Sequence, residues 1–177
     1  MTQQEISLTK SLHSGGQFVL FNDSANSRNV NPLSYHNFVG DYGEKWLVSQ
    51  FNQSGYIAQL TSQTAHEGDL RVLDTQTGEY IKIEAKTALE TTSGYGFCIN
   101  KLKKTSCSYS DFVALICIDK CLSHYLYLIH PSLLQNSQFI RIPSHPTRYA
   151  GKYAPFRVRG LINIEDSRTT HETWSIR

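Results

Sequence analysis

The chain has 177 residues, of which 40% are hydrophobic, and its 17 Lys and Arg against 15 Asp and Glu give a formal net charge of +2. This length and composition are typical of one globular domain and exclude a wholly disordered chain. No apolar run reaches about 18 residues, and the first ten residues are polar, so we expect neither a membrane-spanning helix nor a secretory signal. All 4 cysteines fall within residues 98–121, which favours reduced thiols in a cytoplasmic protein.

Charge is distributed unevenly along the chain. Residues 41–90 hold eight acids and four bases, whereas residues 120–164 hold six bases and no acid. A concentrated set of carboxylates suits a hard cation, and clustered bases suit a polyanion such as a nucleic acid. Ordinary variation over a solvated surface explains the same pattern about equally well.

In chain order, the first predicted segment is a loosely attached polar arm at 1–30. Apolar residues then recur at three- and four-residue steps, which predicts an amphipathic helix from Asn31-Pro32 to about Asn52, ended by Ser54-Gly55. Strands are predicted at 56–61, 68–74, 79–86, 97–100, 112–118 and 124–130, with a four-residue turn at 75–78. The segment after Pro131 is expected to be irregular. The expected organisation is therefore an arm at 1–30, a core at 31–135 and a basic C-terminal extension at 136–177 packed on the core.

The sharpest local feature is the alternation of charge from Glu79 to Lys86. In a strand, Lys82, Glu84 and Lys86 share one face, and the turn at 75–78 would place Asp69 opposite Glu84 and Arg71 opposite Lys82. Two opposed carboxylates repel each other, and a divalent cation with oxygen ligands removes that repulsion. The bare pattern should occur by chance about once in every chain or two of this size, so a charged, solvated strand is the alternative.

Asp69 followed by Glu84-Ala85-Lys86 on the next strand resembles the signature of the PD-(D/E)XK nuclease superfamily. The order of the predicted elements agrees with that family over about residues 38–130, beginning with a helix that bears Glu44. One departure is that the proline that names the motif is absent.

Two branches of the superfamily are similar in detail. Gly43-Glu44 in a helix that ends at Gly55-Tyr56 resembles the Holliday-junction-resolvase-like branch. A group that includes an intron-encoded homing endonuclease is also similar, though less sharply. The resemblance implies an α/β fold with a restriction-endonuclease-like core, in which helices flank a central mixed β-sheet.

The resemblance also implies an activity, a cofactor and partners. It implies a Mg²⁺-dependent endodeoxyribonuclease, with Mn²⁺ as a substitute, in which Asp69, Glu84 and the Ala85 carbonyl hold the metal. Lys86 would position or activate the water, and Glu44 would add or orient a ligand. Cutting both strands of double-stranded DNA needs two active sites, so we expect a homodimer or a higher even assembly. The alternatives are a Holliday-junction resolvase and a non-catalytic DNA-binding module on the same fold.

Basic residues outside this site are candidates for DNA contacts, because Lys and Arg bind phosphates and interleaved aromatic residues can stack on bases. They are Lys101, Lys103, Lys104, Arg141, Arg148, Lys152, Arg157 and Arg159. For the three lysines a solvated face is nearly as good an explanation. The aromatic residues near the arginines would serve equally well to pack the C-terminal extension on the sheet, and we favour that role for Phe156.

Overall fold

The structure is a computed structural model that describes residues 32–62, 68–91, 96–100, 109–134, 139–143 and 152–175. The chain divides into two compact units, residues 1–36 and 37–177, and every strand belongs to the second unit. The predicted arm at 1–30 lies outside the described residues.

The first described element is the helix α3, Pro32–Gln53, which confirms the predicted amphipathic helix. Leu47 and Phe51 lie one turn apart on its inner side and are completely buried. The helix ends in a turn at Ser54 and Gly55, where Gly55 has a φ of +91°, a conformation that glycine adopts readily.

The strands are β1 (Ile57–Leu60), β2 (Leu70–Leu73), β3 (Tyr80–Leu89), β4 (Phe97–Asn100), β5 (Phe112–Ile118), β6 (His124–Ile129) and β7 (Phe139–Ile142). Five of them form one sheet in the order β1-β2-β3-β5-β6, and β4 pairs with β7. Within the large sheet β3 and β5 are parallel and the other neighbours are antiparallel, so the expected central mixed sheet is confirmed.

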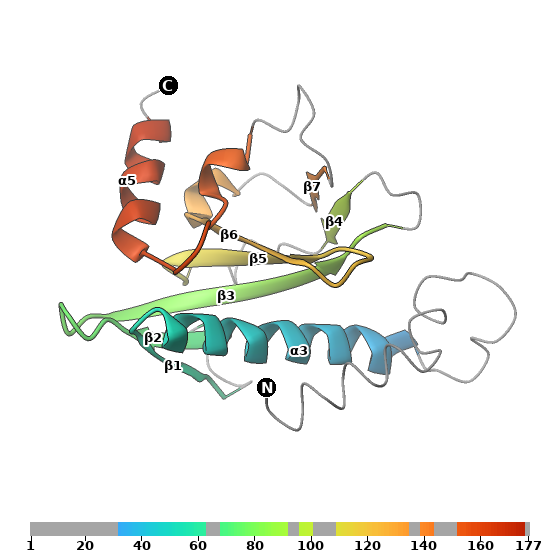
Figure 1. The fold of residues 1–177 in the computed structure, drawn as a ribbon, viewed down its shortest axis with the longest axis horizontal. Helices are drawn as coiled ribbons and strands as arrows, with labels where there is room; N and C mark the ends of the chain where they lie inside the picture. The colour runs from blue at the N-terminus through green and yellow to red at the C-terminus, as the bar shows by residue number, and fades with distance from the viewer. Residues whose placement is uncertain are drawn as a thin grey trace, which may run out of the picture. The chain divides into compact units, whose positions relative to one another are not determined.

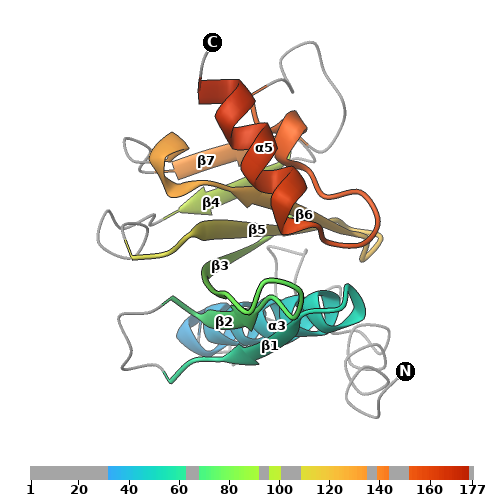
Figure 2. The ribbon, with the colours of Figure 1, turned by 90° about the vertical axis from the view of Figure 1, so that its left-hand side faces the viewer.

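At its centre the large sheet is covered on both faces, because β5 is buried along its whole length. Its side chains alternate between two cores. Phe112, Ala114, Ile116 and Ile118 belong to the core that α3 covers, and Val113, Leu115 and Cys117 belong to the core that β4 and β7 cover. Figures 1 and 2 show α3 and the β4–β7 pair on opposite sides of this sheet.

The predicted register of β2 and β3 is confirmed where the two strands pair. Arg71 lies opposite Lys82 and Leu70 lies opposite Ile83. The turn between the strands is closed by Asp74, whose carboxylate accepts hydrogen bonds from the backbone N–H groups of Gln76 (2.9 Å) and Thr77 (3.4 Å).

The prediction of an irregular segment after Pro131 is wrong. The described residues there form the short helix η3 (Pro131–Leu133), strand β7, the short helix η4 (Ala154–Phe156) and the helix α5 (Ile164–Ser175). Their apolar side chains complete the two cores; they include Ile140, Ile142, Phe156, Ile162 and Ile164. The burial expected for Phe156 is confirmed.

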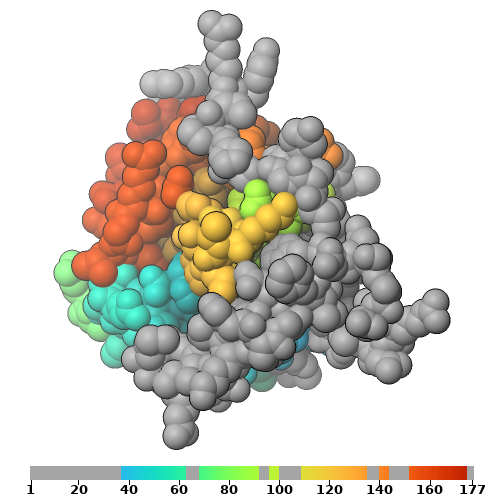
Figure 3. Space-filling view, turned by 45° about the vertical axis from the view of Figure 1, so that its right-hand side comes forward, coloured from blue at the N-terminus to red at the C-terminus, as the bar shows by residue number. Residues whose placement is uncertain are grey.

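Hydrogen bonds attach the start of α5 to the end of α3. The backbone N–H of Ile162 donates to Ser54 Oγ (2.8 Å), and that of Ile164 donates to Tyr56 Oη (3.1 Å). Figure 3 shows the orange-red segment that leads into α5 lying against the cyan end of α3. The C-terminal residues are therefore part of the same packed unit as the sheet.

In the part of the chain that the structure describes, no helix is long and apolar enough to cross a membrane. Cys98, Cys117 and Cys121 form no disulfide there. Burial raises the pKa of the Cys117 thiol, so this residue packs as a small apolar side chain.

Candidate active site

The site predicted from the sequence lies at a fork in the sheet. The β2–β3 ladder ends at Leu70 and Ile83, whereas β3 continues to Leu89 beside β5. From Glu84 onward, therefore, β3 pairs with β5 on one edge only. On its other edge, the one that faces β2, no described strand pairs with it. Buried backbone groups on such an edge need other partners.

Asp69 supplies one of those partners. Its own N–H donates to the Ile83 carbonyl (2.9 Å), which extends the strand pairing by one bond. Its Oδ2 accepts a hydrogen bond from the N–H of Ala85 (2.8 Å). The sequence predicts Asp69 opposite Glu84; in the structure the ladder stops one residue earlier and the Asp69 side chain reaches the β3 edge instead.

Lys86 joins the two carboxylates. Its ammonium group donates to Glu84 Oε1 and to the Ala85 carbonyl (3.1 Å), and it lies 3.7 Å from Asp69 Oδ2. The Glu84 side chain is only 7% exposed, against 31% for Asp69 and 26% for Lys86. A buried carboxylate requires a cationic or hydrogen-bonding partner, and the Lys86 ammonium provides it.

Glu44 approaches the same cluster from α3. The Glu44 side chain is half-buried, and its pKa is raised to about 7, first by burial and then by the negative charges of Asp69 and Asp41, while Lys86 lowers it. Asp69 and Lys86 therefore act electrostatically on the helix carboxyl, and the role of Glu44 in the site stays a prediction.

At the residue next to Glu44, the α3 backbone makes a close contact with β3 that the sequence analysis missed. A Cβ atom added to Gly43 would lie 1.8 Å from Thr87 Oγ1 and 2.9 Å from Thr87 Cβ, so the α3 backbone rests directly on the residue after Lys86. The sequence signal for this contact was the glycine next to Glu44 in the middle of a helix, where glycine is otherwise unfavourable.

A second attachment orients α3 on the sheet. Tyr42 Oη and His124 Nε2 lie 2.8 Å apart, and the Trp46 ring stacks on the His124 ring with centroids 4.8 Å apart. Burial lowers the pKa of His124, which favours the neutral ring in this position.

The structure explains why no proline precedes Asp69. Gly68 has a φ of +81°, and a Cβ atom there would lie 2.7 Å from the Ile83 carbonyl oxygen and 3.1 Å from Ser110 Oγ. Proline is restricted to a φ near −65° and cannot adopt this conformation. Thr61 Oγ1 donates to the Gly68 carbonyl and ties Gly68 to the end of β1.

The oxygen atoms of the cluster suit a hard divalent cation. Among the described residues no group of three or more His, Cys, Asp and Glu side chains forms a metal site by itself. The cluster instead offers two carboxylates and a backbone carbonyl, and all three face the positive charge of Lys86. Oxygen donors of this kind are the ligands that Mg²⁺ and Mn²⁺ prefer.

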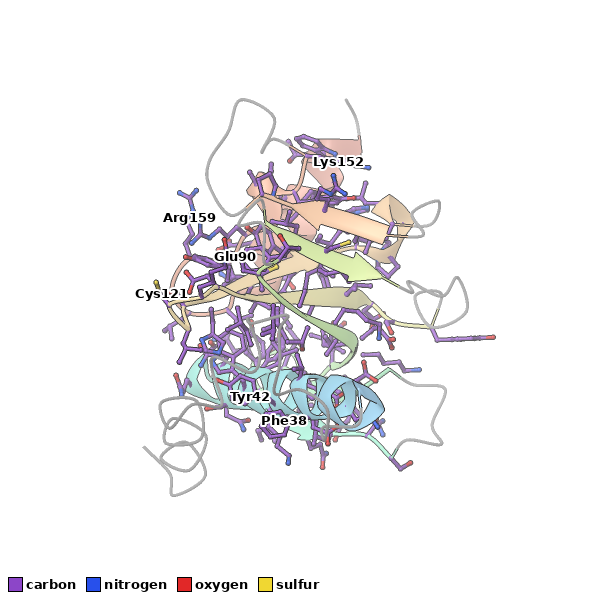
Figure 4. The ribbon with its side chains drawn as sticks, turned by 90° about the vertical axis from the view of Figure 1, so that its right-hand side faces the viewer. Phe38, Tyr42, Glu90, Cys121, Lys152 and Arg159 are labelled. Atoms are coloured by element: carbon purple, nitrogen blue, oxygen red, sulfur yellow. The ribbon has the colours of Figure 1, made fainter. Side chains whose placement is uncertain are left out.

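The described basic candidates lie elsewhere in the fold. Arg157 pairs with Tyr127, which lies across β5 from Lys86, and its guanidinium stacks over the Tyr125 ring (4.6 Å). Arg141 is exposed on β7, and Figure 4 shows Lys152 and Arg159 across the sheet from α3. Lys101, Lys103, Lys104 and Arg148 lie outside the described residues.

Comparison with known proteins finds a likeness in structure and none in sequence. No family model and no curated protein sequence matches the chain. The matching solved structures include the bacterial homing endonuclease I-Ssp6803I, with a TM-score of 0.56 over 80% of this chain and 96% of that chain. The two proteins share a fold.

Their sequence identity is 10%, so the likeness concerns the fold alone. This likeness confirms the nuclease-like fold that the motif implied. Membership of the PD-(D/E)XK superfamily, the site residues and the metal stay predictions.

Proposed function

We propose that this protein is a metal-dependent endonuclease that hydrolyses phosphodiester bonds in double-stranded DNA. The observation that carries the proposal is the convergence of Asp69, Glu84 and the Ala85 carbonyl on one cationic group at the fork of β2 and β3. The shared fold with a homing endonuclease supports the same class of activity.

In this proposal Asp69, Glu84 and the Ala85 carbonyl hold Mg²⁺, for which Mn²⁺ can substitute. Bound there, the ion would polarise the scissile phosphate and lower the pKa of a coordinated water. The Ala85 N–H fixes the orientation of the Asp69 carboxylate, and the burial of Glu84 keeps bulk water away from its charge.

Lys86 and Glu44 have roles beside the metal. The Lys86 ammonium can stabilise negative charge on the phosphate or position the attacking water, because its side chain starts two residues beyond Glu84 on the same face. Glu44 can add or orient a ligand, and a carboxyl with a pKa of about 7 can accept or release a proton near neutral pH. Double-strand cleavage needs two such sites, which we assign to a homodimer or a higher even assembly.

The test uses supercoiled plasmid DNA and a synthetic four-way junction, each incubated with the protein and Mg²⁺. Asp69→Asn and Glu84→Gln should each abolish cleavage while DNA binding persists. Lys86→Ala should lose most cleavage while metal still binds. Glu79→Gln, at the residue that precedes β3 and pairs with Arg168 at the surface, is the control and should cut at the parent rate.

Mg²⁺-dependent cleavage by Asp69→Asn at the parent rate would contradict the site. Cleavage confined to the junction would assign the substrate to branched DNA. DNA binding without cleavage in any divalent metal would favour a non-catalytic binding module.

A further inference from the structure

Two like charges oppose each other on the face of the β2–β3 pair that carries the candidate active site. Arg71 and Lys82 are direct cross-strand partners. Like charges in this position destabilise a sheet. Within the described residues neither side chain forms an ion pair within 4.0 Å. Asp111 is near, but its carboxylate accepts a hydrogen bond from the Lys82 backbone N–H (2.8 Å).

An aromatic ring holds one of the two cations in place. The Arg71 guanidinium carbon lies 4.3 Å from the centre of the Tyr80 ring, and Tyr80 is 51% exposed. A stacked guanidinium keeps its N–H groups in a fixed plane, so less conformational freedom is lost when it binds an anion. Arg71 is exposed and Lys82 is partly buried, so the pair is an accessible, partly preorganised cationic site.

The position of this pair relative to the candidate active site favours one kind of anion, a phosphate of the DNA substrate. Lys82 precedes Glu84 by two residues on the same face of β3, a separation of about 6.6 Å along the strand. Phosphates of one strand advance by about 3.4 Å each along the helix axis, and the strand also turns around that axis, so neighbouring phosphates are farther apart than this axial rise and a step of about 6.6 Å can reach the next one. An anion here would also remove the repulsion between the two side chains.

We propose that Arg71 and Lys82, supported by Tyr80, bind the DNA phosphate next to the one that undergoes cleavage. The proposal rests on the proposed function and adds a second contact on the same strand of the substrate. It assigns these residues to binding and orientation of the DNA, and it gives them no part in the chemical step.

The experiment measures binding of a short fluorescent duplex at several salt concentrations, in EDTA so that no cleavage occurs. Each neutralised phosphate adds about 0.9 to the steepness of log affinity against log salt. Arg71 and Lys82 share one phosphate in this proposal, so Arg71→Gln with Lys82→Gln should reduce the steepness by about 0.9. The unfolding free energy of the DNA-free double variant should stay equal or rise, because a repulsive pair has been removed. Lys45→Gln, an exposed lysine on α3 on the other side of the sheet, is the control and should leave the slope unchanged.

A second measurement locates the contact. After the cleavage position is mapped, a neutral methylphosphonate at the neighbouring phosphate should weaken binding by the parent protein and not by the double variant. An unchanged salt slope, or equal weakening of both proteins, overturns this proposal while leaving the proposed function standing. A parent protein that binds no duplex overturns the proposed function and this proposal together.

Discussion

Gly68 places Asp69 through a backbone conformation that side-chain-bearing residues rarely adopt. We predict that Gly68→Ala is destabilised by at least about 1–2 kcal/mol from its φ of +81° alone, and by more because the new Cβ meets the Ile83 carbonyl. Gly78→Ala is the matched control, because Gly78 has a φ of +77° and nothing within 4 Å of the added Cβ. Thermal unfolding should show a larger loss of stability for Gly68→Ala than for Gly78→Ala. Only Gly68→Ala should also lose cleavage. Equal losses would mean that the space around Gly68 has no effect.

Glu44 makes the stability of the protein depend on pH. Its pKa is about 7 in the folded protein and near 4.5 for an ordinary Glu, so the folded state favours the protonated form. The resulting penalty is absent below about pH 4.5, grows as pH rises and is complete above about pH 7. We predict that Glu44→Gln, without metal, unfolds with a free energy about 1–2 kcal/mol above the parent at pH 8 and equal to it at pH 4.5, after allowance for screening of a half-exposed group. Parallel pH profiles for the two proteins would contradict this assignment.

At the scale of elements, α3 and β3 meet through a glycine. Gly→Ala inside a helix normally stabilises by about 1 kcal/mol, but Gly43→Ala would press on Thr87 and should destabilise by about 1–3 kcal/mol. Thr87→Ala removes the two outer atoms of that contact. The double variant should therefore recover most of the stability and cleavage that Gly43→Ala loses. Additive losses in the double variant, measured by urea unfolding, would show that the two residues do not interact.

Elements with strong local signals could be predicted from the sequence. Strands β4 and β5 have the predicted bounds, and the short β2–β3 turn fixed the register that brings the site residues together. The α5 helix could not be found from apolar periodicity, because its partly buried residues include Arg168 and His171 beside Trp174. Its one clear local signal was Asn163, whose side chain accepts hydrogen bonds from the backbone N–H groups of Glu165 and Asp166.

Strand β7 and the fork depend on residues distant in sequence. Ile140, Arg141 and Ile142 alternate as in a strand, but the partner strand β4 lies about forty residues earlier, and so short a segment is ambiguous without that partner. The Asp69–Ala85 hydrogen bond exists because β2 stops while β3 continues, and no local pattern specifies where a ladder ends.

At the scale of the whole molecule, Arg157, beside β6, lies in the same cross-sheet row as Lys86. Lys86, Leu115, Tyr127 and Arg157 are successive partners, so Arg157 is about 14 Å from Lys86 at the usual strand spacing, a length that a duplex covers in about four base pairs. We predict that Arg157→Gln with Arg159→Gln weakens DNA binding and lowers the salt slope by up to about 1.8. An unchanged slope would show that these arginines do not contact DNA, and Lys101, Lys103 and Lys104 would then be the better candidates for phosphate contacts.

The hydrogen bond from Ala85 to Asp69 gives the protein a built-in spectroscopic probe. The amide proton of Ala85 points at a carboxylate oxygen 2.8 Å from its nitrogen, so the nitrogen–proton NMR signal of Ala85 should move when that carboxylate binds a cation. In Asp69→Ala the same amide loses its acceptor and should exchange with deuterated water faster than the neighbouring β3 amides that remain paired with β5. Occupancy of the site can thus be followed on an unmodified backbone atom, without DNA and without turnover.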